Sequence, residues 1–278
     1  MTLQEALREG QSMLFYAEVE TPALDATVLL AEALSVSKER LLACLPDAVD
    51  AGSYERYRRF LRLRCTGLPV SYIRRRKEFY GLEFAVDERV LVPRPDTETL
   101  IEEALQCLEE APDIRRVHDG CTGTGCIAIT LAHLRPELEV SASDISPQAQ
   151  EVFRQNCLRI LERQLPFFLS DLLAAVPGRF DLITANPPYL SAEEVRKMKK
   201  IGWPEPEVAL DGGEDGTALS ARLIRQAPAK LSPGGVLLLE AAPQQMEALG
   251  ALLEEAGFRG VSVRQDLAGR QRVLRAGV

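Results

Sequence analysis

The sequence predicts a two-part protein of the α/β class, in which a small helical domain precedes a mostly parallel sheet with helices on both faces. Two observations carry this prediction. From about residue 114 onward, short apolar runs with the length of buried strands alternate with stretches whose apolar residues recur at helical spacing. Before residue 79 the apolar spacing is helical throughout. The 278 residues are enough for one large domain or two modest ones.

The composition is that of an ordinary globular protein, and it excludes several classes of function. The formal net charge of −8 argues against a dedicated nucleic-acid binder, which normally carries a basic surface. No apolar run approaches the roughly 20 residues of a membrane span, and the N-terminus lacks the basic and apolar regions of a signal peptide. The six cysteines form no Cys-x-x-Cys pair, and the two histidines have no ligand-like spacing. We therefore expect a cytoplasmic protein with reduced thiols, no membrane attachment and no metal site.

Residues 1–78 are expected to form the helical domain. Thr21-Pro22 has the residue types of a helix start, and apolar residues follow it at helical spacing. Between Tyr54 and Arg64, apolar side chains are interleaved with arginines at the same spacing. No catalytic constellation falls in this part of the chain.

The stretch from Arg56 to Lys77, called the basic stretch below, contains nine basic residues and no acidic one. In an acidic protein such a local excess is informative. Two interpretations are open. The basic residues can form a solvated helix face followed by a linker, or they can form a landing surface for a negatively charged partner, protein or RNA.

Two strands are expected next, Phe79 to Val86 and Arg89 to Val92, joined by a short polar turn. Pro93-Arg94-Pro95 ends the second strand stiffly, because proline fixes the backbone. We place this hairpin, residues 79–95, as the joint between the helical domain and a larger domain of residues 96–278.

Strands and helices then alternate, and the first four expected strands each lead into a polar or glycine-rich segment. In parallel sheets with helices on both faces, ligands bind beyond the carboxyl ends of the strands. The segments that follow the first four strands are therefore the candidates for a site. The expected strands are Ile114 to His118, Leu138 to Ala142, Phe167 to Leu169, Phe180 to Ala185, Val236 to Glu240, Phe258 to Arg264 and Arg272 to Arg275.

The segments after the first three strands suit a nucleoside-type cofactor. The turn from Asp119 to Gly125 is rich in glycine, so its backbone can approach a ligand closely. Asp144, about 20 residues further on, suits two ribose hydroxyls, and Asp171 can accept from an adenine amino group. The same pattern fits a dinucleotide-binding fold, and both aspartates also suit helix N-caps. These alternatives stay open at this point.

The discriminating stretch is Asn186-Pro187-Pro188-Tyr189, after the fourth strand. The two prolines fix the backbone and remove two N–H donors, so the chain leaves the sheet stiffly. The Asn186 amide oxygen and the Pro187 carbonyl then offer two acceptors to a planar NH2 group, which the Tyr189 ring can cover. The alternative is a plain proline-rich turn. A dehydrogenase has no use for such an arrangement.

Further motifs extend along nearly the whole chain. They are Pro69-x-x-Tyr72-Ile73, Glu78-Phe79-Tyr80-Gly81-Leu82, Pro93-Arg94-Pro95-x-Thr97-Glu98, Asp144-Ile145-Ser146, Glu205-Pro206, Asp215-Gly216, Gln244-Gln245 and Asp266-Leu267-Ala268-Gly269-Arg270. With Asn186-Pro187-Pro188-Tyr189, they make the chain resemble the bacterial release factor glutamine methyltransferases, the HemK/PrmC family.

The resemblance implies a Rossmann-like class I methyltransferase sheet of seven strands, the last antiparallel, and S-adenosyl-L-methionine as cofactor. It also implies a helical domain that recognises release factors, whose Gly-Gly-Gln glutamine is methylated on its side-chain nitrogen. We expect a monomer that does not act on nucleic acid. The implied cofactor-binding residues are Cys121, Thr122, Gly123, Thr124, Gly125, Asp144, Asp171, Leu172 and Asn186. The implied substrate-binding residues are Asn186, Pro187, Pro188 and Tyr189, of which Asn186, Pro187 and Tyr189 are catalytic.

Five positions depart from the family pattern. Ala242 replaces a glycine after Glu240, and His118 interrupts a strand that is normally apolar. Cys121 stands at the first glycine of the loop, Arg75 stands where a glycine follows Tyr-Ile-x, and Leu172 stands where a Trp or other bulky residue often follows the third-strand aspartate. We expect Gly120 to let the turn shift by one residue and recover the clearance that Cys121 removes. Two other functions stay open: an amino-methyltransferase acting on adenine or another protein, and a catalytically weak relative that binds a translation partner.

Overall fold

The structure, a computed structural model, describes residues 1–278, and the chain forms two compact units. The first unit contains Met1–Arg76 and Ile201–Pro204, and the second contains Lys77–Lys200 and Glu205–Val278. No helix combines the length and the apolar character needed to cross a membrane.

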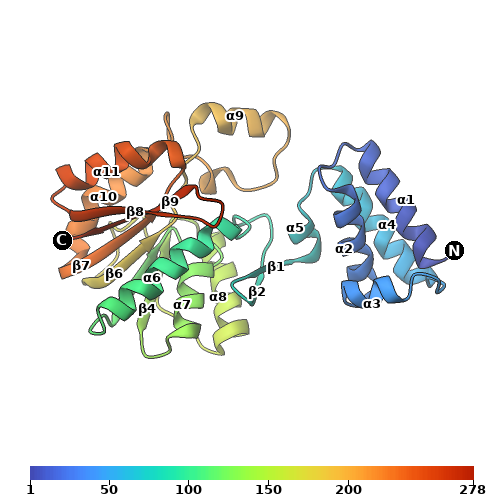
Figure 1. Cartoon of the computed structure of the whole chain (residues 1–278), viewed down its shortest axis with the longest axis horizontal. Coiled ribbons are helices and arrows are strands. Elements are labelled where there is room, and N and C mark those ends of the chain that lie inside the picture. Colours follow the sequence, from blue (N-terminus) through green and yellow to red (C-terminus); the bar gives the residue numbers. More distant parts are fainter. The chain divides into compact units, whose positions relative to one another are not determined.

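The first unit is helical, as the apolar spacing predicts (Figure 1). Three of its helices begin at side-chain N-caps: the Thr2 hydroxyl accepts from the Glu5 N–H in a capping box, and the Ser37 and Asp50 side chains each accept from a backbone N–H. Thr21 stands at the start of α2 without a side-chain cap hydrogen bond. The helices are α1 (Leu3–Tyr16), α2 (Pro22–Leu34), α3 (Lys38–Ala43), α4 (Ala51–Cys65) and α5 (Val70–Arg74). Their apolar faces share one core, to which α1, α2 and α4 contribute Leu14, Leu29, Leu30, Tyr57 and Leu61.

The basic stretch is partly used to hold this unit together. Arg56 donates to the Ala33 carbonyl, Arg64 pairs with Asp25, and Arg74 and Arg76 both pair with Glu32. Arg58, Arg59 and Arg62 of α4 are exposed instead and lie on one helix face. A docking surface built from this stretch is therefore smaller than the sequence suggests.

The hairpin differs from the expected one. Strands β1 (Arg76–Phe79) and β2 (Leu82–Ala85) pair around a turn at Tyr80 and Gly81, whose φ angles are 50° and 74°. Two successive positive φ angles match the twist of the flanking strands, which fixes the turn here rather than at Asp87-Glu88. The second expected strand is wrong: residues 87–90 form a turn, closed by the Val90 N–H on the Asp87 carbonyl.

The second unit contains the predicted seven-stranded sheet. Its strands are β3 (Arg116–Gly120), β4 (Glu139–Asp144), β5 (Phe167–Leu169), β6 (Phe180–Ala185), β7 (Leu231–Glu240), β8 (Arg259–Gln265) and β9 (Gln271–Gly277). They lie in the order β5-β4-β3-β6-β7-β9-β8, and β9 is antiparallel to both of its neighbours. Strands β4 and β5 extend the sheet on one side of β3, whereas β6 and β7 extend it on the other side. Because β3, β4, β5 and β6 are parallel, their carboxyl ends lie at one edge of the sheet, next to this switch in strand order.

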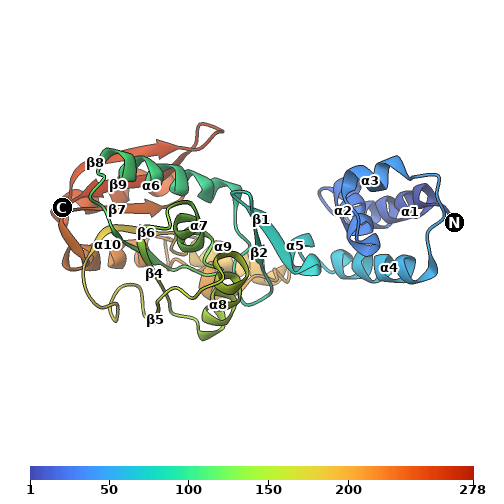
Figure 2. The ribbon, with the colours of Figure 1, turned by 90° about the horizontal axis from the view of Figure 1, so that it is seen from below.

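Helices cover both faces of this sheet (Figures 1 and 2). One core joins α6, α7 and α8 to the face that carries Val117, Val140 and Leu182, and a second core joins α10 and α11 to the face that carries Ile183 and Leu237. The helices are α6 (Glu98–Glu110), α7 (Cys126–Leu134), α8 (Pro147–Leu161), α9 (Ala192–Lys200), α10 (Ala218–Lys230) and α11 (Met246–Glu255). Short 3-10 helices are η1 (Pro95–Thr97), η2 (Glu207–Ala209) and η3 (Pro243–Gln245).

His118 is a structural residue of the core, although it interrupts an otherwise apolar strand. Its Nδ1 and Nε2 each lie 2.9 Å from a hydroxyl, those of Ser141 and Ser143 on the neighbouring strand β4. The ring stacks on Phe180 with 4.7 Å between centroids. Burial lowers the pKa of His118 to about 3, so the imidazole is neutral and its hydrogen bonds are satisfied inside the sheet.

Candidate active site

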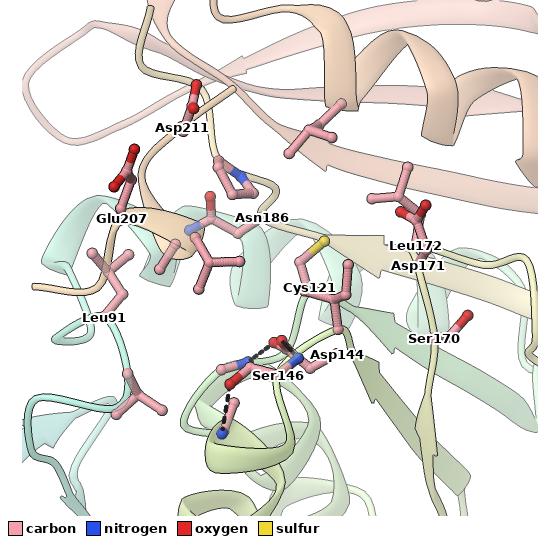
Figure 3. A pocket seen from close by; sticks show the side chains of 18 of the residues that line it. Leu91, Cys121, Asp144, Ser146, Ser170, Asp171, Leu172, Asn186, Glu207 and Asp211 are labelled. Carbon is pink, nitrogen blue, oxygen red and sulfur yellow. Dashed lines mark hydrogen bonds between the residues drawn. The ribbon is translucent and has the colours of Figure 1, made fainter. Parts of the chain in front are cut away.

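A pocket of about 540 Å³ opens at the carboxyl ends of β3, β4, β5 and β6 (Figure 3). It is called the large pocket below. Its volume falls within the range of small-molecule sites. The lining residues come from the ends of these strands and the segments after them, from the segment before η1, from the loop around η2, and from α8 and α10. They are Arg89, Val90, Leu91, Cys121, Gly123, Asp144, Ile145, Ser146, Ala149, Ser170, Asp171, Leu172, Asn186, Pro188, Glu207, Val208, Ala209, Asp211, Leu219 and Arg222.

The turn after β3 is held from below by Asp119, which the sequence analysis did not select. Its buried carboxylate accepts from the hydroxyls of Thr122 and Thr184. Burial is the main cause that raises the pKa of Asp119, to about 7. Gly125 is the N-cap of α7 with φ 83°, and a Cβ there would come within 2.6 Å of Phe153. The turn is thus shaped by packing beneath it.

Cys121 has a left-handed backbone conformation, which favours glycine. Its φ is 58°, whereas Gly120 lies in β3 and pairs in register with Ser143 and Ala185. The expected shift of the turn onto Gly120 is therefore wrong, because two parallel ladders hold Gly120 in the strand. Figure 3 shows the Cys121 sulfur directed toward the large pocket. Burial raises the pKa of this thiol, so it is uncharged.

Asp144 is oriented by two backbone donors. The Gly123 N–H donates to Oδ2 and the Ser146 N–H donates to Oδ1, each at 2.9 Å. Each carboxylate oxygen keeps a further lone pair, so Asp144 can still accept from a ligand in the large pocket. Burial raises the pKa of Asp144, and the backbone hydrogen bonds oppose that rise. The helix-cap alternative does not apply, because the N-cap of α8 is Ser146.

The segment after β5 brings Asp171 and Leu172 to the pocket wall. Asp171 pairs with Arg222 of α10, and both side chains are about half exposed. Leu172 adopts a positive φ of 53° and is itself buried against the second core.

The structure brings six of the nine predicted cofactor residues into the pocket wall: Cys121, Gly123, Asp144, Asp171, Leu172 and Asn186. Thr122, Thr124 and Gly125 do not line the pocket. The Thr122 hydroxyl is taken by Asp119, and the Thr124 carbonyl accepts from the Asn156 amide of α8. These three residues shape the turn from behind.

A second, smaller pocket of about 190 Å³ lies on the far side of Asn186 and is called the small pocket. Asn186, Pro188, Leu91 and Ala209 line both pockets, so the two cavities share a wall. The small pocket is lined by Leu91, Arg94, Asn186, Pro187, Pro188, Tyr189, Leu190, Met198, Glu205, Ala209 and Leu210. All four residues of the predicted substrate motif therefore lie together, and Asn186 stands between the cavities.

The motif is locked by the segment around η2 and by η3. The Leu190 N–H donates to the Leu210 carbonyl, and the Gly212 N–H donates back to the Leu190 carbonyl. The Gln245 side chain donates to the Tyr189 carbonyl at 2.9 Å. A Cβ on Gly216 would come within 2.4 Å of the Tyr189 carbonyl oxygen, which explains why this position requires glycine. No protein group donates to the Pro187 carbonyl, which stays available as an acceptor.

Three residues that the sequence analysis did not select complete the site. Thr97 and Glu240 lie behind Asn186, and Glu205 borders the small pocket. The buried Glu205 carboxylate accepts from the Val92 N–H and pairs with Arg94. Thr97 and Glu205 stood in the quoted family motifs, whereas Glu240 appeared only as the end of an expected strand. Their hydrogen-bond partners lie far away in sequence.

Comparisons with known proteins agree with this arrangement. The family described as PrmC N-terminal domain matches residues 5–74, and the family described as Methyltransferase small domain matches residues 97–201. A solved methyltransferase from Pyrococcus furiosus superposes with a TM-score of 0.51 at 18% identity, over 72% of this chain and 90% of that chain. That likeness shows the fold alone.

Curated relatives match almost end to end. The chain is 40% identical over 278 residues to the release factor glutamine methyltransferase of Cereibacter sphaeroides, covering 99% of this chain and 98% of that protein. It is 37% identical over 279 residues to the protein of the same name from Moorella thermoacetica, again covering 99% and 98%. The chain therefore belongs to the family of release factor glutamine methyltransferases.

Proposed function

We propose that the protein transfers a methyl group from S-adenosyl-L-methionine to the side-chain nitrogen of the glutamine in the Gly-Gly-Gln tripeptide of peptide-chain release factors. The observation that carries this proposal is the meeting of the large and small pockets at Asn186. The names of the full-length relatives support the choice of substrate.

The large pocket fits the cofactor through its hydrogen-bond acceptors and its open glycine-rich turn. Asp144 would accept from the ribose hydroxyls, Asp171 from the adenine amino group, and Gly123 would lie against the methionine part. The position of a Cβ on Gly123 has nothing within 4 Å, so its backbone faces open space. Once bound, S-adenosyl-L-methionine supplies an electrophilic methyl group on a sulfonium sulfur.

The small pocket fits the carboxamide. Its volume of about 190 Å³ suits one side chain, and Tyr189 and the two prolines give it a stiff, flat wall. In this proposal, the Asn186 amide oxygen and the Pro187 carbonyl accept from the two N–H groups of the substrate nitrogen. Tyr189 packs on the amide plane.

Positioning supplies the missing reactivity. A carboxamide nitrogen is a poor nucleophile because its lone pair is delocalised into the carbonyl. Near-attack alignment is worth about 7–11 kcal/mol in favourable cases. The same two acceptors stabilise the positive charge that grows on the nitrogen during transfer. The nitrogen becomes more acidic as that charge develops, so a dedicated general base is not required.

Recognition of the partner is proposed to involve the helical residues 1–78, with residues 96–278 carrying the transfer. The face of Arg58, Arg59 and Arg62 on α4 supports this assignment, because all three side chains are exposed and, of the three, only Arg58 makes an ion pair, at 3.8 Å to Glu9. We further propose that the protein acts as a monomer and does not take nucleic acid as its substrate, which the net charge of −8 supports.

The deciding experiment is mass spectrometry of purified release factors incubated with the protein and S-adenosyl-L-methionine. One added methyl group on the glutamine of Gly-Gly-Gln is expected, and a release factor with asparagine in place of that glutamine should stay unmodified. An adenine-containing oligonucleotide and an isotherm for the cofactor serve as parallel arms. Cofactor binding without methylation of any release factor would favour the weak relative, and methylated adenine would overturn the assigned substrate.

A further inference from the structure

A buried chain of hydrogen bonds runs behind Asn186. The Asn186 side-chain NH2 donates to the Thr97 hydroxyl at 3.2 Å, and that hydroxyl donates to Glu240 Oε1 at 3.2 Å. Thr97 is 2% exposed and Glu240 is 1% exposed. The three residues end three separate elements: Thr97 ends η1, Asn186 follows β6 and Glu240 ends β7.

The chemistry of Glu240 fixes which groups donate and which accept in these hydrogen bonds. An ionised carboxylate only accepts hydrogen bonds. The single hydroxyl proton of Thr97 is therefore directed to Glu240, and only the lone pairs of that hydroxyl remain for Asn186. Asn186 must then present its NH2 to Thr97.

The opposite end of the Asn186 amide is consequently its oxygen. An asparagine whose amide turned by half a rotation would offer NH2 donors to a substrate NH2 group, which would be repulsive. A reversed Asn186 amide would therefore disturb the contact with the substrate, although the residues that set its orientation, Thr97 and Glu240, lie behind it. The two orientations of the Asn186 amide have the same shape, so only the hydrogen bonds that the amide makes distinguish its oxygen from its nitrogen.

We propose that Thr97 and Glu240 are positioning residues that hold the Asn186 amide with its oxygen toward the substrate nitrogen. The inference rests on the proposed contact between Asn186 and the substrate. Neither Thr97 nor Glu240 lines the large or the small pocket, so both act through Asn186.

The burial of Glu240 supports a role beyond packing. Its second oxygen, Oε2, is buried without a hydrogen-bond partner in the protein. A buried carboxylate that is not fully hydrogen-bonded destabilises a fold, and an apolar side chain of similar size usually serves stability better. Glu240 therefore stands at a position where stability alone favours an apolar side chain. Burial raises its pKa to about 7, so the carboxylate that sets the direction predominates above that pH.

The test compares Thr97→Val, which keeps the shape but loses the hydroxyl, with Thr97→Ser, which keeps the hydroxyl. Assays are run above the pKa of Glu240, with kcat, the KM for a release factor and the Kd for S-adenosyl-L-methionine measured separately. We expect Thr97→Val to lower kcat by at least about tenfold, a smaller loss than the roughly 10²–10³ expected when a preorganised contact is removed outright. The Kd for S-adenosyl-L-methionine should stay within about twofold of the wild-type value. Thr97→Ser should restore most of kcat. Glu240→Gln should resemble Thr97→Val, because its amide can either donate or accept.

A second measurement does not depend on activity. The side-chain NH2 resonance of Asn186, assigned by its loss in Asn186→Ala, should shift and exchange faster with solvent in Thr97→Val than in Thr97→Ser. Wild-type kcat in Thr97→Val, or equal losses in both Thr97 variants, would overturn the positioning role. If the wild-type protein methylates no release factor, the proposed function fails instead, and the resonance still decides whether the hydrogen-bond chain exists.

Discussion

The guanidinium of Arg222 pairs with the carboxylate of Asp171 at the rim of the large pocket, and both side chains are about half exposed. An exposed ion pair contributes at most about 1 kcal/mol. We expect Asp171→Asn to weaken S-adenosyl-L-methionine binding about tenfold, because a charge-assisted acceptor becomes a neutral one. Arg222→Gln should weaken it less than about fivefold. Isothermal calorimetry measures both, and equal losses would mean that the pair, not the carboxylate, matters.

Cys121→Gly is expected to stabilise the fold. Cys121 holds a φ of 58°, which costs a residue with a Cβ about 1–2 kcal/mol, while glycine loses roughly 0.5–1 kcal/mol more entropy on folding. The net gain in the free energy of unfolding should be about 0.5–1 kcal/mol, read by denaturant unfolding. Cys121→Ala is the matched control, since it keeps the Cβ and should gain nothing.

The same pair of variants tests the cofactor site. The Cys121 sulfur lies in the pocket wall, so Cys121→Gly should tighten S-adenosyl-L-methionine binding by less than about tenfold. A parent protein that binds no cofactor, rescued by glycine, would instead make the weak relative the better reading of this chain.

Asn186→Ala is expected to lower turnover by about 10²–10³, as for one lost preorganised contact in a transition state. Asn186 follows β6 and faces two pockets, so its loss should leave the free energy of unfolding nearly unchanged. Single-turnover kinetics with a release factor measure the effect. Turnover equal to that of the parent would remove Asn186 from the reaction.

The stability of the protein should fall as the pH rises toward neutrality. Burial raises the pKa of Asp119 to about 7, above its unfolded value near 4, so the folded state binds more protons between these values. The stabilisation is fully present below the unfolded pKa and is lost as the pH rises through 7. Urea unfolding across this window should show a shallower fall in Asp119→Asn. The pKa of Glu240 is raised as well, but Glu240 is present in both the parent and Asp119→Asn, so it does not affect the comparison. Parallel curves would contradict the assignment.

Reversing the charge of Arg58, Arg59 and Arg62 to Glu should weaken release-factor binding and reduce its dependence on salt, with cofactor affinity unchanged. Arg225→Glu with Arg259→Glu, two exposed positions of the second unit, is the control for a general change of charge. Binding is measured by titration at two ionic strengths. Methylation that is undiminished at limiting release factor would locate the docking surface elsewhere.

The sheet and the acceptors at its edge could be predicted because their signals are local. Asp144, Asp171 and Asn186 each stand within two residues of the end of an expected strand, and the parallel topology then brings them together. Thr97 and Glu240 could not be found this way, since their hydrogen bonds join residues 89 and 143 positions apart. The hairpin turn at Tyr80 was missed for a different reason: a tyrosine with φ 50° gives no sequence signal of a left-handed conformation.

The position of β9 in the sheet has a consequence for how the protein folds during synthesis. Strand β9 is synthesised after β7 and β8, yet it lies between them in the sheet. Until Gln271–Gly277 leave the ribosome, β7 keeps one unpaired edge and β8 has no partner in the sheet. Unpaired edges recruit other chains, so a premature stop before this strand should yield aggregates rather than a trimmed enzyme.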